Sequence, residues 1–257
     1  MKIVFSKKYY NSSYSRDPAA APGRLEGIME ILSGENGYSI IAPIQARDED
    51  ILRAHTTRHL SYIKKDPLLF ELAALAAGGA ILAAEEGFKG HPTFALIRPP
   101  GHHASSDSCW GFCFFNNVSV SLLKLHSENK IRSAFVLDFD LHVGDGNINI
   151  LSNRNDGFKV DILNPQDERN GNAYIAEIEE YMQQLEGIDI FCASAGFDQG
   201  IEDWGNLLTT EHYKKIGILM KKYSEKLCKG RRYALFEGGY NHSVLPKNVA
   251  AFCKGFR

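Results

Sequence analysis

One short segment of the sequence places two kinds of metal-binding side chain close together. Asp140 and His142 are separated by one residue, and in an extended chain residues i and i+2 point the same way. A carboxylate oxygen and an imidazole nitrogen can therefore reach the same ion. Asp198 is the candidate third ligand, because two carboxylates and one neutral histidine balance a divalent cation and leave a position open for water and substrate. Gly196, two residues earlier, would let the chain turn sharply there.

The donor types and the surrounding motif indicate which ion this is. Oxygen and nitrogen donors without a thiolate suit zinc, and iron(II), cobalt or manganese accept the same set. An isolated Asp-x-His triplet is weak evidence, and Asp138 could simply cap a following helix. The triplet lies, however, in a longer Asp-x-Asp-x-His-x-Gly-Asp-Gly pattern, and the chain also has a histidine pair at His102–His103 and a Gly-Gly-Tyr ending at Tyr240. The combination predicts a catalytic metal site.

These polar residues follow predicted β-strands. Short apolar or β-branched runs alternate with helical patterns, which is typical of a mainly parallel sheet with helices on both faces. The predicted strands are Lys2–Phe5, Tyr38–Ile41, Thr93–Ile97, Ala134–Leu137, Phe158–Leu163, Ile188–Ser194 and Tyr233–Phe236. Active sites in such sheets form beyond the carboxyl ends of the strands. Because several strands end beside titratable residues, we expect one site at one edge of the sheet.

Helical segments with recognisable ends lie between the strands. Asp66 and Pro67 supply an N-cap and a first-turn proline. The predicted helices are Asp66–Gly87, a helix from Thr209 or Thr210 towards Gly230, and Asn172–Leu185. The longest apolar stretch, Leu72–Ala84, is shorter than the roughly 20 residues that span a bilayer. It predicts a buried helix, and no membrane partner is expected.

The composition is ordinary for a globular protein. The chain has 257 residues, of which 44% are hydrophobic and 23% charged, enough to bury a full core. It has no repeat or linker, so a single domain over residues 1–257 is expected. The net charge is −2 without a long basic run, which gives no electrostatic reason to expect a nucleic-acid partner.

The cysteines and the first residues indicate a compartment. Five widely spaced cysteines without a Cys-x-x-Cys pair argue against a disulfide framework and favour a reducing cytoplasm. Cys192 lies in an apolar run and is expected to be buried. The segment Met1–Phe5 soon becomes polar and lacks the apolar region of a signal peptide. We therefore expect a cytoplasmic location.

Taken together, the motifs resemble the histone deacetylase and acetylpolyamine amidohydrolase family, in the form of a short prokaryotic-type member. The matching stretches are Arg98–His103, Gly111–Asn117, Asp138–Gly146, Ser194–Asp198 and Glu237–Asn241, with weaker agreement at Pro22–Glu26 and Asp50–His55. They span most of the chain in the expected order. The resemblance implies a three-layer α/β/α fold with a mainly parallel central sheet, arginase-like in type, and a metal-dependent deacetylase activity.

The resemblance also implies a role for each matching residue. The zinc ligands it implies are Asp140, His142 and Asp198. His102 and His103 would be a tandem general acid/base pair, with His103 beside the nucleophilic water. Asp138 would orient His102, and Asp145 would orient His103, each carboxylate raising the basicity of its imidazole.

Substrate contacts and a second ion follow from the same resemblance. Tyr240 would donate a hydrogen bond to the substrate carbonyl and to the oxyanion formed from it. Phe112 would line an acyl channel, and the carbonyl of Gly111 would accept the substrate amide N–H. A structural potassium ion, held by backbone oxygens of Asp138 and Asp140, is compatible with the pattern.

The chain departs from the family in two places. Val143 stands where a second histidine is common, although that histidine is not a ligand. Asn147–Asn172 is shorter than the corresponding family segment, so one channel wall, opposite Phe112, is expected to be missing. Asp66 is the candidate for the rim aspartate that grips a substrate backbone, and Asp107 with its neighbour is expected to shape the entrance. These features predict a wider and shallower site, which a narrow tunnel with aromatics on both walls would contradict.

The predicted reaction removes an acetyl or other acyl group from an amine, with an acetyl-lysine peptide, an acetylpolyamine or another small acylated amide as substrate. Two alternatives stay open. A catalytically silent, deacetylase-like binding protein would explain the short segment, and an arginase-like ureohydrolase would need two manganese ions. The oligomeric state is not indicated. No metal role is assigned to His55, His59, His91, His126, His212 or His242; His55 is expected to pack within a helix, and His242 to lie at the rim.

Overall fold

The protein is built around one parallel β-sheet of seven strands, in the order β2-β1-β3-β7-β6-β4-β5. The computed structural model describes residues 1–152 and 154–257. The strands are β1 (Lys2–Val4), β2 (Ser39–Ile41), β3 (Thr93–Ala95), β4 (Ser133–Asp138), β5 (Lys159–Leu163), β6 (Ile190–Ala195) and β7 (Arg232–Phe236). Every pairing between neighbouring strands is parallel. The predicted strands are all present, with ends displaced by one or two residues.

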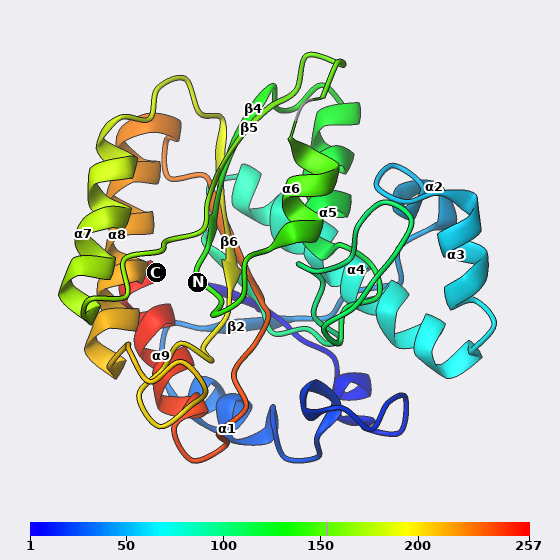
Figure 1. Cartoon of the computed structure of the whole chain (residues 1–257), viewed down its shortest axis with the longest axis horizontal. Helices are drawn as coiled ribbons and strands as arrows, with labels where there is room; N and C mark the ends of the chain where they lie inside the picture. The colour runs from blue at the N-terminus through cyan, green and yellow to red at the C-terminus, as the bar shows by residue number, and fades with distance from the viewer. Residues whose placement is uncertain (153) are drawn as a thin grey trace.

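Helices cover both faces of the sheet (Figure 1). On one face lie α1 (Glu26–Gly34), α7 (Gly171–Gln183), α8 (Thr210–Cys228) and α9 (Leu245–Phe256). On the other lie α4 (Pro67–Phe88), α5 (Asn117–Ser127) and α6 (Asp145–Leu151), with α2 (Asp48–Ile51) and α3 (Thr57–Ile63) farther from the sheet. Two short 3₁₀ helices, Lys7–Tyr10 and Pro18–Ala20, lie near the N-terminus. The predicted α/β/α architecture is confirmed.

The predicted N-caps of α4 and α8 are confirmed by their hydrogen bonds, whereas the helix predicted over Asn172–Leu185 runs from Gly171 to Gln183. The side chain of Asp66 accepts from the backbone N–H groups of Leu68 and Leu69 at the start of α4. The side chain of Thr209 accepts from the N–H of His212 and caps α8. These caps supply partners for N–H groups that the first turn of a helix leaves free.

Helix α4 is long and apolar enough to span a membrane by length and composition, the one such helix among the described residues. Its apolar stretch is mostly buried, against the sheet on one side and α5 on the other. Two adjacent glycines let other segments approach it closely: a Cβ on Gly78 would stand 1.8 Å from the carbonyl oxygen of Ile44. The burial agrees with the predicted core helix.

The sequence analysis did not predict α1, α2, α3, α5, α6 or α9. It also placed His55 in a helix, which is wrong: His55 lies in the turn between α2 and α3. There its Nε2 accepts the N–H of Asn116 at 2.8 Å, and its Nδ1 lies 3.0 Å from the carbonyl of Ser105. His55 is buried, as predicted, and its contacts connect this turn to the loop that follows the histidine pair.

The four strands that precede the predicted site residues are neighbours in the sheet. They run in the order β3, β7, β6, β4, and parallel strands deliver their carboxyl ends to the same edge. The loops after these strands therefore meet at one place.

Candidate active site

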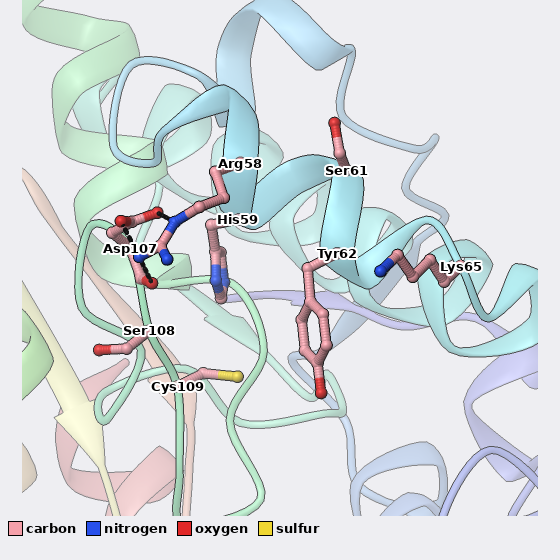
Figure 2. A pocket seen from close by; sticks show the side chains of 8 residues that line it. All are labelled: Arg58, His59, Ser61, Tyr62, Lys65, Asp107, Ser108 and Cys109. Carbon is pink, nitrogen blue, oxygen red and sulfur yellow. Dashed lines mark hydrogen bonds and ion pairs between the residues drawn. The ribbon is translucent and has the colours of Figure 1, made fainter.

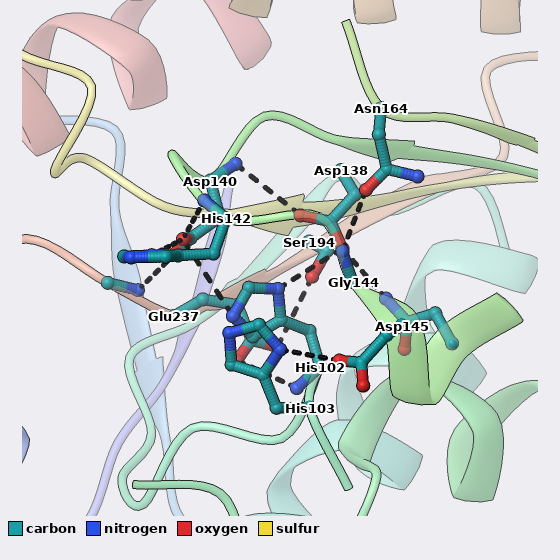
Figure 3. Close-up of polar contacts among 12 residues, drawn as sticks. His102, His103, Asp138, Asp140, His142, Gly144, Asp145, Asn164, Ser194 and Glu237 are labelled. Atoms are coloured by element: carbon teal, nitrogen blue, oxygen red, sulfur yellow. Dashed lines mark hydrogen bonds and ion pairs between the residues drawn. The ribbon is translucent and has the colours of Figure 1, made fainter. Parts of the chain in front are cut away.

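Asp140, His142 and Asp198 come together at the carboxyl ends of β4 and β6. Candidate ligand atoms of the three residues all lie within 4.8 Å of one another. The Nδ1 of His142 is 3.4 Å from Oδ1 of Asp140 and 3.5 Å from Oδ2 of Asp198. Figure 3 shows His142 turned towards Asp140, with the histidine pair beside them. The three predicted ligands thus form one cluster.

The hydrogen bonds of the two carboxylates suit a bound cation. Oδ2 of Asp140 accepts the N–H of Gly238 at 2.9 Å, and Oδ1 of Asp198 accepts the N–H of Leu141 at 3.1 Å. Oδ2 of Asp198 is buried without a hydrogen-bond partner in the described structure. Burying a charged oxygen without a partner is costly, and a metal ion in the cluster would supply one.

Two glycines leave room for these carboxylates. A Cβ on Gly196 would stand 2.1 Å from Oδ2 of Asp140, and one on Gly238 would stand 2.6 Å from Oδ2 of Asp198. Gly196 is not among the residues with positive φ. A left-handed turn is therefore not what requires glycine here; the position needs glycine because the Asp140 carboxylate lies directly against it.

The histidine pair lies beside this cluster, and each imidazole contacts the carboxylate that was predicted to orient it (Figure 3). Nδ1 of His103 is 2.7 Å from Oδ1 of Asp145, and Nδ1 of His102 is 3.3 Å from Oδ2 of Asp138. The ring of His103 is 5.8 Å from that of His142. A contact through Nδ1 leaves the Nε2 of His103 free for a reacting group.

The two adjacent histidines differ in protonation. Burial, assisted by His102, lowers the pKa of His103 to about 4. Burial also acts to lower the pKa of His102, but the carboxylates of Asp140 and Asp138 outweigh it and raise that pKa well above its usual value. His103 therefore holds its proton less strongly than His102 and is neutral near neutral pH, so His103 is the member able to accept a proton.

A cavity of about 300 Å³ opens above these groups. Its lining residues are Pro100, His102, His103, Trp110, Gly111, Phe112, His142, Trp204, Gly238 and Tyr240. The predicted substrate contacts Gly111, Phe112 and Tyr240 are among them. Burial and the nearby Asp140 raise the pKa of Tyr240, so its hydroxyl keeps its proton and can donate a hydrogen bond.

Several known proteins are similar to this chain along most of its length. A profile of the histone deacetylase domain matches residues 19–174. The chain belongs to the histone deacetylase family. A probable deacetylase of Methanothermobacter thermautotrophicus is 28% identical over 91% of this chain and 84% of its own length. A histone deacetylase-like amidohydrolase of Pseudomonas aeruginosa is 24% identical over 87% of this chain and 72% of its own.

A solved structure shows the same fold. The HD domain of HDA15 superposes with a TM-score of 0.84 at 20% identity, over 99% of this chain and 88% of that one. The matched relatives are named as deacetylases and amidohydrolases, so hydrolase activity follows for this chain at the level of the family.

Two buried charged residues form hydrogen bonds with the loops that carry the histidine pair and Tyr240. The sequence analysis did not single out either residue. Oε2 of Glu237 accepts the N–H of Gly101 at 2.7 Å and holds the loop that carries the histidine pair. Nε of Arg24 donates to the carbonyl of Gly239 at 2.8 Å, just before Tyr240. Both residues lie in stretches that resemble the family, but full burial of a charged side chain is rare and has no local signal in sequence.

More aromatic side chains line the cavity than the sequence analysis predicted. No described residue of the segment 147–172 lines it, as expected. Trp204, from the loop after β6, instead stacks on Tyr240 with ring centroids 4.0 Å apart, while Trp110 and Phe112 come from the loop after β3. The sequence analysis expected a missing wall opposite Phe112 and did not predict that Trp204 lines the cavity. A wider and shallower site stays a prediction.

The other expected rim residues lie outside the cavity lining. His242 is exposed beside Gly23. Val143, which stands where the family commonly has a second histidine, is 43% exposed. Asp66 caps α4 and borders an adjoining cavity of about 540 Å³. Asp107 binds Arg58 in a further cavity of about 600 Å³ next to α3, where Figure 2 shows the two side chains in contact. The potassium ion stays a prediction.

Proposed function

We propose that this chain is a zinc-dependent amidohydrolase that removes an acetyl or other acyl group from an amine nitrogen. The observation that carries the proposal is the cluster of Asp140, His142 and Asp198, with its unpartnered carboxylate oxygen, beside a neutral His103 in one cavity. The oxygen and nitrogen donors fit zinc, and iron(II), cobalt and manganese are the alternatives.

The residues around the cavity would divide the reaction among them. A bound divalent metal supplies a Lewis acid that polarises the amide carbonyl and acidifies water. His103, held by Asp145, would take a proton from the attacking water at Nε2 and return one to the departing amine. The hydroxyl of Tyr240 would donate to the carbonyl oxygen as negative charge develops on it. The carbonyl of Gly111 would accept the amide N–H.

The substrate is proposed as a class: an acetyl-lysine peptide, an acetylpolyamine or another small acylated amide. The cavity of about 300 Å³ is at the small end of the range for ligand sites. Its walls are mainly aromatic, which suits the carbon chain on either side of an amide.

The test is a screen of acyl-amides with metal analysis of the same preparation, run beside the His103→Ala and Tyr240→Phe variants. One zinc per chain and hydrolysis that both substitutions reduce would support the proposal. A chain that holds zinc and binds the amides without hydrolysing any would be a binding protein. Two manganese ions with hydrolysis of a guanidino substrate would indicate a ureohydrolase.

A further inference from the structure

The proposed base, His103, packs against the indole of Trp110, with ring centroids 3.8 Å apart and an angle of 32° between the ring planes. The same indole donates its N–H to Oδ2 of Asp145 at 2.9 Å. The other oxygen of this carboxylate, Oδ1, lies 2.7 Å from Nδ1 of His103. Trp110 therefore contacts both members of the pair that would handle the proton.

The two histidine–carboxylate pairs of the site differ in how the carboxylate is held. The side chain of Asp138, which contacts His102, is fully buried, and its Oδ2 also accepts the side-chain N–H of Asn147 at 2.9 Å. The side chain of Asp145 is instead 49% exposed. An exposed carboxylate can rotate and exchange its hydrogen bonds with water, so burial alone does not keep Asp145 on His103. The indole N–H on its second oxygen supplies that restraint.

A tight turn places the indole over the imidazole. The N–H of Cys113 donates to the carbonyl of Trp110 at 3.0 Å and closes the turn. Its central residues, Gly111 and Phe112, have φ values of 57° and 66°. Positive φ is unfavourable for a residue with a Cβ, such as Phe112, and such strain persists only where the surrounding structure fixes the chain. A Cβ on Gly111 would stand 2.3 Å from Cδ2 of His103, so the backbone of the turn lies directly against the imidazole.

We propose that Trp110 is a positioning residue for the amide hydrolysis: its N–H holds Asp145 against His103, and its ring face stabilises the imidazolium of protonated His103. The inference rests on the proposed function and adds a residue to its acid/base machinery. When His103 takes a proton at Nε2, its Nδ1–H stays on Asp145, so the ring becomes positively charged while in contact with the indole. A cation against an aromatic face is favoured over a neutral group of the same size.

Nuclear magnetic resonance tests the two hydrogen bonds without a substrate. The chain has two tryptophans, Trp110 and Trp204, so the protein with ¹⁵N-labelled indoles should give two side-chain N–H signals. Asp145→Ala should shift the Trp110 signal upfield and leave the Trp204 signal in place. Trp110→Phe keeps an aromatic ring without the N–H, and should broaden or remove the downfield signal of the Nδ1–H of His103. If either variant left its signal unchanged, the proposal would be overturned.

Steady-state kinetics tests whether these contacts serve the reaction. We expect Trp110→Phe to lower kcat for an acetyl-amide by about 10-fold with little change in KM, because losing a group that supports a histidine–carboxylate pair typically costs about 10- to 100-fold. Trp110→Leu also removes the ring face and should lower kcat roughly 2- to 5-fold further. A higher KM with unchanged kcat would make Trp110 only a wall of the cavity and would overturn the proposal.

Tyr62→Phe is the matched control for these measurements. It removes one hydrogen-bond donor from an exposed aromatic ring that borders the adjoining cavity but does not line the catalytic one. Both kcat and KM should therefore stay at the wild-type values in this variant.

A double-mutant cycle separates an effect through Asp145 from a general effect on packing. In the Asp145→Ala background, Trp110→Phe should change kcat by less than about 2-fold, because the N–H has no carboxylate left to hold. An equal loss in both backgrounds would overturn the proposal. Both side chains are about half exposed, so these variants should fold. Hydrolysis with unshifted signals would leave the amidohydrolase and remove the positioning role. Shifted signals in a protein that hydrolyses no amide would support the contacts and remove the proposed function.

Discussion

His103 is the residue on which the proposed chemistry depends most directly. It is neutral near neutral pH, and Asp145 orients it. Replacing it with alanine should lower kcat/KM for an acetyl-amide by about 10²–10⁴-fold, the usual contribution of a general base. Zinc content should stay at the wild-type level, because His103 is not in the ligand cluster. His242→Ala, at an exposed histidine outside the cavity, should leave both quantities unchanged. An active His103→Ala enzyme would remove the assigned base.

Tyr240 should show a different kinetic pattern. Tyr240→Phe keeps a ring that can stack on Trp204 but removes the hydroxyl that would face the developing oxyanion. We expect kcat to fall by about 10²–10³-fold with little change in KM. Steady-state kinetics at saturating substrate measures both. A rise in KM with kcat unchanged would mean that the hydroxyl only holds the substrate.

Gly238 lets the backbone lie close to the proposed metal site. Its N–H donates to Asp140, and a Cβ would stand 2.5 Å from that carboxylate. Gly238→Ala should therefore lower the zinc content of the purified protein while its far-ultraviolet circular dichroism stays native. Gly34→Ala is the matched control, since a Cβ there meets no atom within 4 Å. Full zinc occupancy in Gly238→Ala would show that the carboxylates can move aside.

At the scale of elements, α4 depends on the absence of a side chain at Gly78. A Cβ there would overlap the Ile44 carbonyl, and overpacking of a buried contact typically costs about 1–3 kcal/mol. Gly78→Ala should lower the free energy of unfolding by a similar amount, which would appear as a lower urea midpoint of unfolding. Gly34→Ala should leave the midpoint unchanged. An unchanged midpoint would mean that the segment near Ile44 shifts freely and does not hold α4.

The strands and the closeness of Asp140 to His142 could be predicted because their signals are local. Apolar runs such as Ala134–Leu137 indicate buried parallel strands, and the spacing of Asp140 and His142 is visible in three residues. The order of the strands has no such signal. Trp110 and Trp204 meet at one cavity because the loops after β3 and β6 converge, which depends on the tertiary fold. For the same reason the sequence could not show Trp204 stacked on Tyr240.

The helices that were not predicted are mainly short or begin with polar residues. α5 begins at Asn117 after the cap Asn116, in a stretch rich in serine and valine that has low helix propensity. Packing against α4 outweighs that propensity. α6 has only seven residues and begins within the metal motif, at Asp145. The first residues of α6 therefore belong both to the Asp-x-Asp-x-His-x-Gly-Asp-Gly motif and to a helix. The residue types of the motif do not show the apolar spacing by which a helix is predicted.

At the scale of the whole molecule, we expect metal and protons to compete for the cluster of Asp140, His142 and Asp198. Without metal, the nearby carboxylates of Asp140 and Asp198 raise the pKa of His142 from 6.5 to about 10. A raised histidine pKa stabilises the fold below the unfolded value, and this stability is lost as pH rises through the folded value. The EDTA-treated protein should therefore show a falling Tm between pH 6.5 and about 10.

Zinc should change this dependence in a defined direction. Binding replaces the proton on His142, so affinity for zinc rises with pH, and saturating zinc should raise Tm most at the alkaline end. His142→Gln should flatten the profile of the EDTA-treated protein and abolish the zinc effect. Differential scanning fluorimetry across the pH range measures both. A Tm indifferent to zinc at every pH would argue against a metal in this cluster.

The place of β7 in the sheet has a consequence for the growing polypeptide. β7 is the last strand in chain order, yet it lies in the middle, between β3 and β6. On the ribosome, β2-β1-β3 and β6-β4-β5 can form only as two separate halves, each with an open edge, until residues 232–236 emerge and join them. Because Gly238 and Tyr240 follow β7 in the chain, the proposed site is complete only after that insertion. Until then the exposed edges of β3 and β6 are where premature aggregation would begin.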